Sequence, residues 1–183
     1  VETERDSLET ARRERAERRE AIGDELESLR TRIERLEREA VEAFNGHMDE
    51  LLAVLGYGNL DRIWIERREE RVREGRERVD RARFDLHIVR TADDGTAYED
   101  TIHHLSESER EVTGLVFALA GYLAHEVYEV VPFVLLDSLE AIDSARIAAL
   151  VEYFEEYAPN IVVALLPEDA RALDDDYARV TEI

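Results

Sequence analysis

The chain has 183 residues and a formal net charge of -21, and because it contains no lysine its 24 strongly basic residues are all arginine. A hydrophobic content of 44% argues against a disordered acidic tail, and the absence of cysteine excludes disulfides and thiolate metal sites. This acidity is typical of a halophilic protein surface, since near 1 M salt the Debye length falls to about 3 Å and self-repulsion is screened.

Neither a membrane span nor a signal peptide is recognised in the sequence. No run approaches the roughly 20 apolar residues that a membrane helix needs. We therefore expect a cytoplasmic protein without membrane contact. The chain begins at Val1, inside a heptad pattern and without methionine, so we expect a piece of a longer protein.

Residues 1–42 are expected to form a coiled-coil arm. Apolar side chains recur at the two heptad positions that make a seam, namely Leu8, Ile22, Leu29 and Leu36 on one and Leu26, Ile33 and Ala40 on the other. Arginine occupies seam positions 12, 15 and 19, so the apolar seam weakens toward the N-terminus. Such a polar helix needs a partner helix to be stable. The alternative is a solvated surface helix.

Residues 43–183 are expected to form one α/β lobe. Its first half is predicted to contain a helix that ends at Gly56, antiparallel strands over 60–65, 84–89 and 97–102, and a turn at 93–95. Residues 66–83 fit two structures. Their Glu and Arg spacing suits i,i+4 pairs on a helix, yet Gly75 could equally turn a long hairpin.

After residue 105 the pattern alternates between helix and strand. We predict a helix over 106–126, a strand over 132–136, a helix over 144–157, a strand over 161–166 and a short helix over 167–173. Both strand segments are continuous apolar runs, which is typical of parallel strands buried on both faces.

Two segments could carry chemistry. Ser106 followed by Glu109 is a capping-box pattern, and the N–H groups at such a helix start can also bind phosphate. Asp137 ends an apolar strand, where a carboxylate could serve Mg²⁺, although a turn or cap is the alternative. Asp143 is placed to cap the next helix.

The forms Leu-Ser-Glu-Ser-Glu-Arg at 105–110 and Leu-Leu-Asp-Ser-Leu-Glu-Ala-Ile-Asp at 135–143 resemble the archaea-specific SMC-related proteins of haloarchaea. The resemblance implies an α/β fold, the C-terminal lobe of an ABC/SMC-type P-loop ATPase head behind a coiled-coil helix. It also implies ATP and Mg²⁺ as cofactors. The residues it implies are Ser106, Glu107, Ser108 and Glu109 for ATP bound to a partner head, Asp137 for Mg²⁺ through water, and Asp143 for the D-loop.

The chain departs from that family pattern in several places. Glu107 and Ser108 replace the two signature glycines, and Ser138 stands where a catalytic Glu usually follows the Walker B aspartate. The catalytic candidates are therefore Glu140, which could replace that Glu from the loop, and Ser138 at the position itself. No switch histidine follows the strand over 161–166, and no Walker A loop with its lysine is present. We therefore expect that the chain does not hydrolyse ATP alone.

The resemblance implies the C-terminal half of an ATPase that acts on DNA in chromosome organisation, segregation or repair, associated with the nucleoid. Its implied partners are the Walker A-bearing N-terminal lobe of the same protein, a second copy joined through heads and coiled coil, and DNA. DNA binding rests on the family alone, because the net charge of -21 argues against a broad phosphate-binding face. The alternative is a non-enzymatic coiled-coil dimerisation module with a degenerate head.

Overall fold

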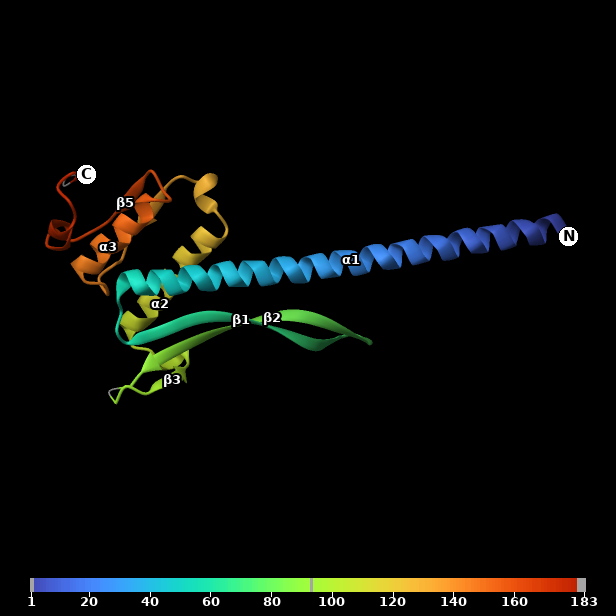
Figure 1. Cartoon of the computed structure of the whole chain (residues 1–183), viewed down its shortest axis with the longest axis horizontal. Coiled ribbons are helices and arrows are strands. Elements are labelled where there is room, and N and C mark those ends of the chain that lie inside the picture. The colour runs from blue at the N-terminus through green and yellow to red at the C-terminus, as the bar shows by residue number, and fades with distance from the viewer. Residues whose placement is uncertain (1, 93, 181–183) are drawn as a thin grey trace. The chain divides into compact units, whose positions relative to one another are not determined.

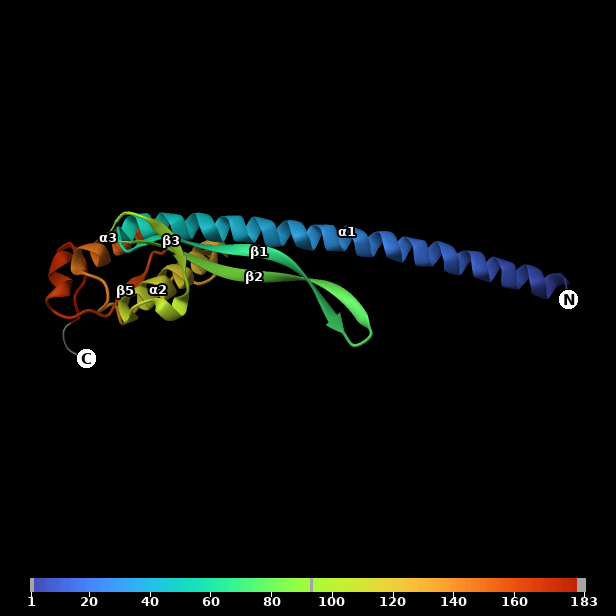
Figure 2. The same ribbon diagram turned by 90° about the horizontal axis from the view of Figure 1, so that it is seen from below.

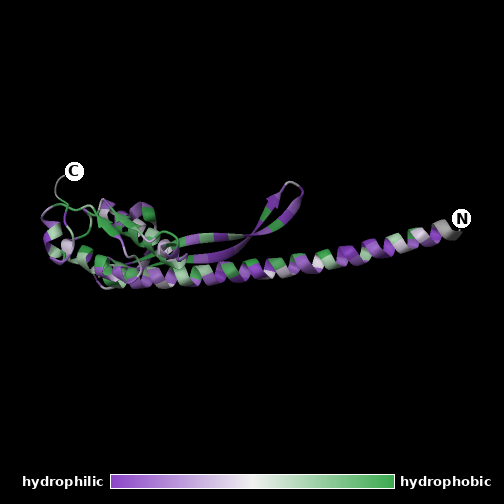
Figure 3. Ribbon diagram, turned by 90° about the horizontal axis from the view of Figure 1, so that it is seen from above, coloured by the Kyte–Doolittle hydropathy of each residue, from purple (hydrophilic) through white to green (hydrophobic). Residues whose placement is uncertain are grey.

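The computed structural model describes residues 2–92 and 94–180 and divides into two compact units, residues 1–39 and 40–183 (Figure 1). Helix α1 (Glu2–Leu55) forms the first unit and continues into the second. In the first unit the apolar side chains of the predicted seam are exposed. Figure 3 shows hydrophobic bands at intervals along a mostly hydrophilic helix. The helix is confirmed. Its coiled-coil pairing and the boundary at 42/43 stay predictions.

The C-terminal end of α1 lies in the hydrophobic core of the second unit. Met48, Leu51 and Leu55 are buried there. The helix then stops at Gly56, whose φ of +54° is a conformation that suits glycine. The Gly56 N–H donates to the carbonyl of Leu52 at 2.9 Å. The predicted helix end is therefore confirmed.

Residues 66–83 form a hairpin and not a helix. Strands β1 (Leu60–Glu74), β2 (Glu77–Thr91) and β3 (Ala97–Asp100) make an antiparallel sheet in that order (Figure 2). Gly75, with φ +61°, turns the hairpin. Opposite charges meet across the strands, since Arg71 donates to Asp80 at 2.8 Å and Arg81 pairs with Glu74. Cross-strand pairs thus take the place of the helical i,i+4 pairs.

The strand predicted over 97–102 is shorter in the structure. β3 ends at Asp100, and a 3₁₀ turn, η1 (Ile102–His104), leads to the next helix. The Asp100 carboxylate accepts the N–H of Thr101 at 2.8 Å, which helps to turn the chain out of the sheet. In the turn predicted at 93–95, Gly95 has φ +82°, and residue 93 lies outside the described residues.

The alternation predicted after residue 105 is confirmed. The elements are α2 (Glu107–Ala124), η2 (Val127–Glu129), β4 (Val134–Leu136), α3 (Ser144–Glu155), β5 (Ile161–Val163) and η3 (Asp169–Ala172). Strands β4 and β5 pair in parallel as predicted, with Val134 opposite Ile161. Both strands are shorter than the apolar runs that contain them, and the short helix predicted near 167–173 is a 3₁₀ turn.

The prediction that β4 and β5 are buried on both faces is wrong. Val134 and Leu136 belong to the core that α2 and α3 build, whereas Leu135 is 60% exposed and Val162 is 49% exposed. The reason is that the core covers one face of this two-stranded sheet, and none of the described elements buries the other. An apolar sheet face is thus open in this chain.

Candidate functional site

Helix α2 begins with the capping box that the sequence predicts. Ser106 Oγ accepts the N–H of Glu109 at 3.3 Å, and Glu109 Oε2 accepts the N–H of Ser106 at 2.8 Å. The Ser106 hydroxyl also donates to Glu109 Oε2 at 2.8 Å, so its single proton is engaged within the protein. The N–H groups of Glu107 and Ser108 lie in the first turn, where a helix offers no acceptor of its own.

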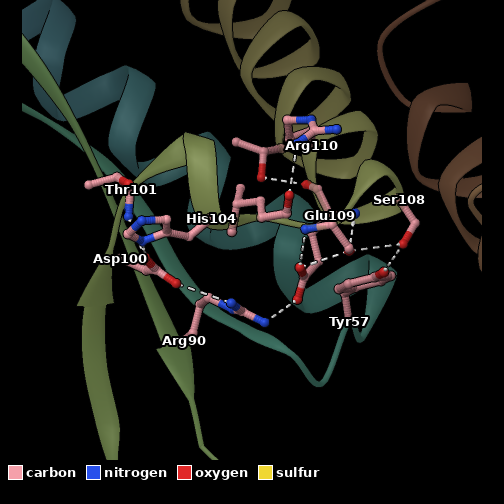
Figure 4. Close-up of polar contacts among 11 residues, drawn as sticks. Tyr57, Arg90, Asp100, Thr101, His104, Ser108, Glu109 and Arg110 are labelled. Carbon is pink, nitrogen blue, oxygen red and sulfur yellow. Dashed lines mark hydrogen bonds and ion pairs between the residues drawn. The ribbon is translucent and has the colours of Figure 1, made fainter.

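Glu109 joins the start of α2 to the antiparallel sheet (Figure 4). Its side chain is only 4% exposed, and its Oε1 accepts from Arg90 Nη2 at 2.8 Å. Arg90 Nη1 also donates to Asp100 Oδ2 at 3.1 Å, and Asp100 Oδ1 lies 2.8 Å from Nδ1 of His104. Sequence reasoning missed Arg90 and Asp100, because neither lies in a motif and strand pairing alone brings them to α2.

The network holds its carboxylates in the ionised form. Burial raises the pKa of Glu109, but hydrogen bonds from Ser106 and the charge of Arg90 outweigh burial and lower that pKa overall. The pKa of Asp100 is lowered mainly by the Thr101 N–H, with His104 and Arg90 contributing. Near neutral pH, Glu109 is therefore a buried anion that fixes Ser106.

A second set of contacts connects Ser108 to Asp143. The Tyr57 hydroxyl donates to Ser108 Oγ at 3.4 Å, and the Arg146 guanidinium lies 5.3 Å from the centre of the Tyr57 ring. Arg146 Nη1 donates to Asp143 Oδ2 at 2.7 Å. Asp143 is also the N-cap of α3, since its Oδ1 accepts the Arg146 N–H at 3.1 Å. Ser108 and Asp143 are thus linked through Tyr57 and Arg146, and the D-loop role of Asp143 stays a prediction.

Asp143→Ala is expected to destabilise the second unit by about 1 kcal/mol, because α3 loses its N-cap. Asp143→Asn is the matched control, since asparagine caps helices about as well as aspartate and should cost only a few tenths of a kcal/mol. Urea unfolding in molar salt measures both. Equal losses in the two variants would instead assign the effect to the charge pairing with Arg146.

The segment after β4 is a tight loop. Ser138 has φ +58°, which is uncommon for a non-glycine residue, and its N–H donates to Asp137 Oδ1 at 2.9 Å. Leu139 is buried, and its carbonyl accepts the N–H of Ile142 at 2.9 Å. These bonds hold the loop while Asp137, Ser138 and Glu140 remain exposed.

A pocket of about 220 Å³ lies between this loop and α2. Its walls are Glu111, Leu115, Asp137, Ser138, Leu139, Ala141 and Ile142. The structure therefore brings Asp137 and Ser138 beside α2, while Glu140 and the residues at 106–109 lie outside the pocket walls. Sequence reasoning passed over Glu111, which lines the same pocket as Asp137. No spacing signal singles it out from the other exposed acids of the chain.

The described part of the chain does not build a metal cage. Within it, no group of three or more histidine, cysteine, aspartate or glutamate side chains could hold a metal ion. A Mg²⁺ ion bound to a nucleotide needs fewer protein ligands, since one or two carboxylates complete its coordination together with waters and phosphates. The exposed Asp137 at its strand end fits that limited role. Among residues 2–92 and 94–180, no helix has the length and apolar content for crossing a membrane.

The homologues of this chain are Smc-like proteins of haloarchaea, which confirms the predicted resemblance. It is 65% identical over 155 residues to the Smc-like protein Sph3 of Haloferax volcanii and 58% identical over 160 residues to the Smc-like protein Sph2 of Halobacterium salinarum. Each match covers 85% of this chain and 24% of the relative, so the chain spans about a quarter of their length. The Smc-like protein Sph1 of Halobacterium salinarum is 39% identical over 85 residues, 46% of this chain and 13% of the relative.

No protein family model matches the chain. Among solved structures, the Smc head domain with a coiled coil and joint derived from Pyrococcus yayanosii aligns with 86% of this chain and 29% of that chain, at a TM-score of 0.47 and 23% identity. The predicted α/β fold, with a long N-terminal helix, antiparallel strands and parallel strands, is confirmed by the elements themselves.

Proposed function

We propose that this chain supplies the C-terminal half of an SMC-like ATPase head, and that ATP joins two such heads. The observation that carries the proposal is the linkage of Ser108, at the start of α2, to Asp143 through Tyr57 and Arg146. The two segments that would face a partner head are thereby held in one set of contacts. The haloarchaeal Smc-like homologues support the same assignment.

The start of α2 would bind phosphate of an ATP held by the partner head. Helix N-termini attract anions, and the N–H groups of Glu107 and Ser108 are the donors there. Glu109 would act as a positioning residue, because it orients Ser106 while Arg90 balances its charge. The exposed Glu107 carboxylate would have to point away from phosphate, since like charges repel.

Asp137 would hold Mg²⁺ through water at the end of β4. When bound, Mg²⁺ neutralises charge that develops on the transferred phosphoryl group. Ser138 offers a hydroxyl and no base, so Glu140 is our candidate for orienting the attacking water. Glu140 is exposed on the same loop as Asp137, although it does not line the pocket that Asp137 lines.

A Walker A-bearing lobe has to come from outside this sequence, because the chain contains no lysine. The open face of β4 and β5 offers that lobe a place. Phe133, Leu135 and Val162 are exposed there, although parallel strands are normally covered on both faces and a two-stranded sheet is marginal alone. The proposal therefore includes the N-terminal lobe of the same protein covering this sheet.

DNA action, in chromosome segregation or repair and in the nucleoid, enters the proposal through the family resemblance. The second candidate function is a non-enzymatic dimerisation module with a degenerate head. Two observations favour it: the Ser106 hydroxyl already donates its proton to Glu109, and Ser138 stands at the position of the usual catalytic Glu.

The proposal is tested by co-expressing the chain with its N-terminal lobe and measuring ATP turnover in molar salt. Asp137→Asn and Glu140→Gln are each expected to lower turnover about 100-fold or more, because each removes a group acting in the transition state. Glu168→Gln, which changes an exposed acid after β5, is the matched control and should leave turnover unchanged.

ATP-dependent association of the reunited head separates the two functions. Association without turnover in the wild type would indicate an ATP-gated clamp. If association is independent of ATP and Ser106→Arg does not alter it, the dimerisation module is correct and the ATPase proposal fails.

A further inference from the structure

The hairpin of β1 and β2 carries positive charge in an otherwise acidic chain. Residues 67–83 contain eight arginines and five acids, a net charge of +3, so the remainder of the chain carries -24. The last residue of β1 that packs against the core is Ile65. Because a strand rises about 3.3 Å per residue, Arg73 lies roughly 25 Å further along this narrow ribbon (Figure 2). The positive charge is therefore carried by a projecting pair of strands.

Like charges face each other at three places in the hairpin. The strand register sets two arginine pairs and one glutamate pair directly opposite, namely Arg68 with Arg83, Arg73 with Arg78, and Glu74 with Glu77. Such pairs destabilise an antiparallel sheet unless a neighbouring side chain balances their charge.

Two of these three pairs are balanced by neighbouring side chains. Arg68 donates to Glu66 at 2.9 Å, and Arg83 donates to Asp85 at 2.8 Å. The glutamate pair has a cation of its own, since one of its carboxylates pairs with Arg81. The hairpin thus balances its own charge in these two places.

The pair of Arg73 and Arg78, next to the turn, has no such balance. Within the described residues, neither side chain forms an ion pair, nor does Arg76 in the turn itself, and all three are exposed. Arg73 Nε donates to the carbonyl of Gly75 at 3.1 Å, so its terminal nitrogens stay available to an anion. These three arginines are called here the arginine tip.

The shape of the hairpin suits phosphate groups on a nucleic-acid strand. Successive phosphates offer a separate anion to each guanidinium, and a two-stranded ribbon is narrow enough to enter the major groove, which is about 12 Å wide. The net charge of -21 opposes a broad phosphate-binding face. The tip avoids that repulsion, because its distance from the core is several times the Debye length of about 8 Å or less.

We propose that the arginine tip binds the phosphate backbone of duplex DNA. The inference rests on the DNA action in the proposed function, and it assigns that contact to Arg73, Arg76 and Arg78. Contacts to phosphate carry no base information, so the tip holds DNA without regard to sequence. It needs neither ATP nor the start of α2.

The salt dependence of DNA binding tests the proposal. The chain is co-expressed with its N-terminal lobe, and fluorescence anisotropy measures its affinity for a labelled duplex of random sequence between half-molar and two-molar KCl. In Arg73→Gln/Arg78→Gln the slope of log affinity against log salt should become shallower by about 1.8, because each phosphate contact contributes about 0.9. An unchanged slope, or an unmodified protein that does not bind the duplex, would overturn the proposal.

The balanced arginine pair supplies the matched control. Arg68→Gln/Arg83→Gln removes the same charge from the same hairpin and should leave the slope unchanged, since both arginines already pair with acids. An equal loss in the two variants would show a general charge effect and no specific contact. Urea unfolding checks the fold, and Arg73→Gln/Arg78→Gln should not be less stable, because it removes a repulsive pair.

An acidic protein segment is the competing occupant. If polyglutamate binds more tightly than the duplex, and Arg73→Gln/Arg78→Gln releases it, the tip recognises carboxylates and the proposal is wrong. ATP turnover without DNA separates this inference from the proposed ATPase. Turnover should be the same in the unmodified protein and in the tip variant, so a loss of DNA binding alone concerns the tip and leaves the ATPase assignment intact.

Discussion

Arg90→Met is expected to destabilise the second unit by about 3 kcal/mol. The substitution keeps an unbranched apolar side chain about as long as the aliphatic part of arginine, but it leaves Glu109 and Asp100, which are 4% and 9% exposed, without their shared cation. Removing one partner of a buried ion pair costs about 3–5 kcal/mol, because the remaining charge stays buried and uncompensated. Arg90 is itself 22% exposed, so we expect the lower end of that range.

The hairpin contains a matched control for this prediction. Arg71 donates to Asp80 at 2.8 Å, the same distance as between Arg90 and Glu109. The side chains of Arg71 and Asp80, however, are 64% and 60% exposed. Arg71→Met should therefore cost much less stability than Arg90→Met, because an exposed ion pair is screened by solvent. Urea unfolding at fixed molar salt compares the two variants. Equal losses would show that the Arg90 network contributes no more than a surface pair.

Acid is expected to remove the same stabilisation without a mutation. Glu109 and Asp100 have pKa values lowered by folding, so in acid the unfolded chain binds more protons than the folded one. Their contribution is complete above the ordinary carboxyl pKa of about 4 and is lost as the pH falls through the lowered values. Urea midpoints should therefore stay level between pH 6 and pH 5 and fall once the pH drops below about 4.

Glu109→Gln isolates this effect. Glutamine can still accept a hydrogen bond from Ser106 or Arg90 but does not titrate, so the variant should begin less stable and lose less stability on acidification. The series needs molar salt, because protonating the 45 acidic residues also relieves self-repulsion, which acts in the opposite direction. Parallel pH curves for the two proteins would contradict the assignment of Glu109 as a stabilising anion.

Local patterns were sufficient where neighbouring residues decide the structure. The helix end at Gly56, the capping box of Ser106 and Glu109, and the cap of Asp143 all follow from the conformational preferences of a few adjacent residues. The hairpin was not decidable in this way. The spacing of Glu and Arg over 66–83 satisfies both helix and strand, and only the pairing of β1 with β2 chooses between them.

The apolar sequence runs predicted more burial for β4 and β5 than the structure shows. Such a run around Leu135 predicts a strand covered on both sides, and that inference assumes that the covering elements are part of the same chain. Here the core covers one face of the sheet, and Leu135 and Val162 stay exposed. The pattern is consistent with the proposed N-terminal lobe, which lies outside this sequence.

Composition, periodicity and short motifs were enough to predict the acidic, arginine-only surface, the long helix, the α/β alternation and the similarity to SMC-related proteins. The folded structure was needed to show that Arg90 links Glu109 at the start of α2 to Asp100, that Tyr57 and Arg146 connect Ser108 to Asp143, and that Glu140 lies outside the pocket of Asp137. Those contacts join residues far apart in the chain. A polar side chain finds such partners only when strand pairing and core packing have placed them, and no local spacing encodes that placement.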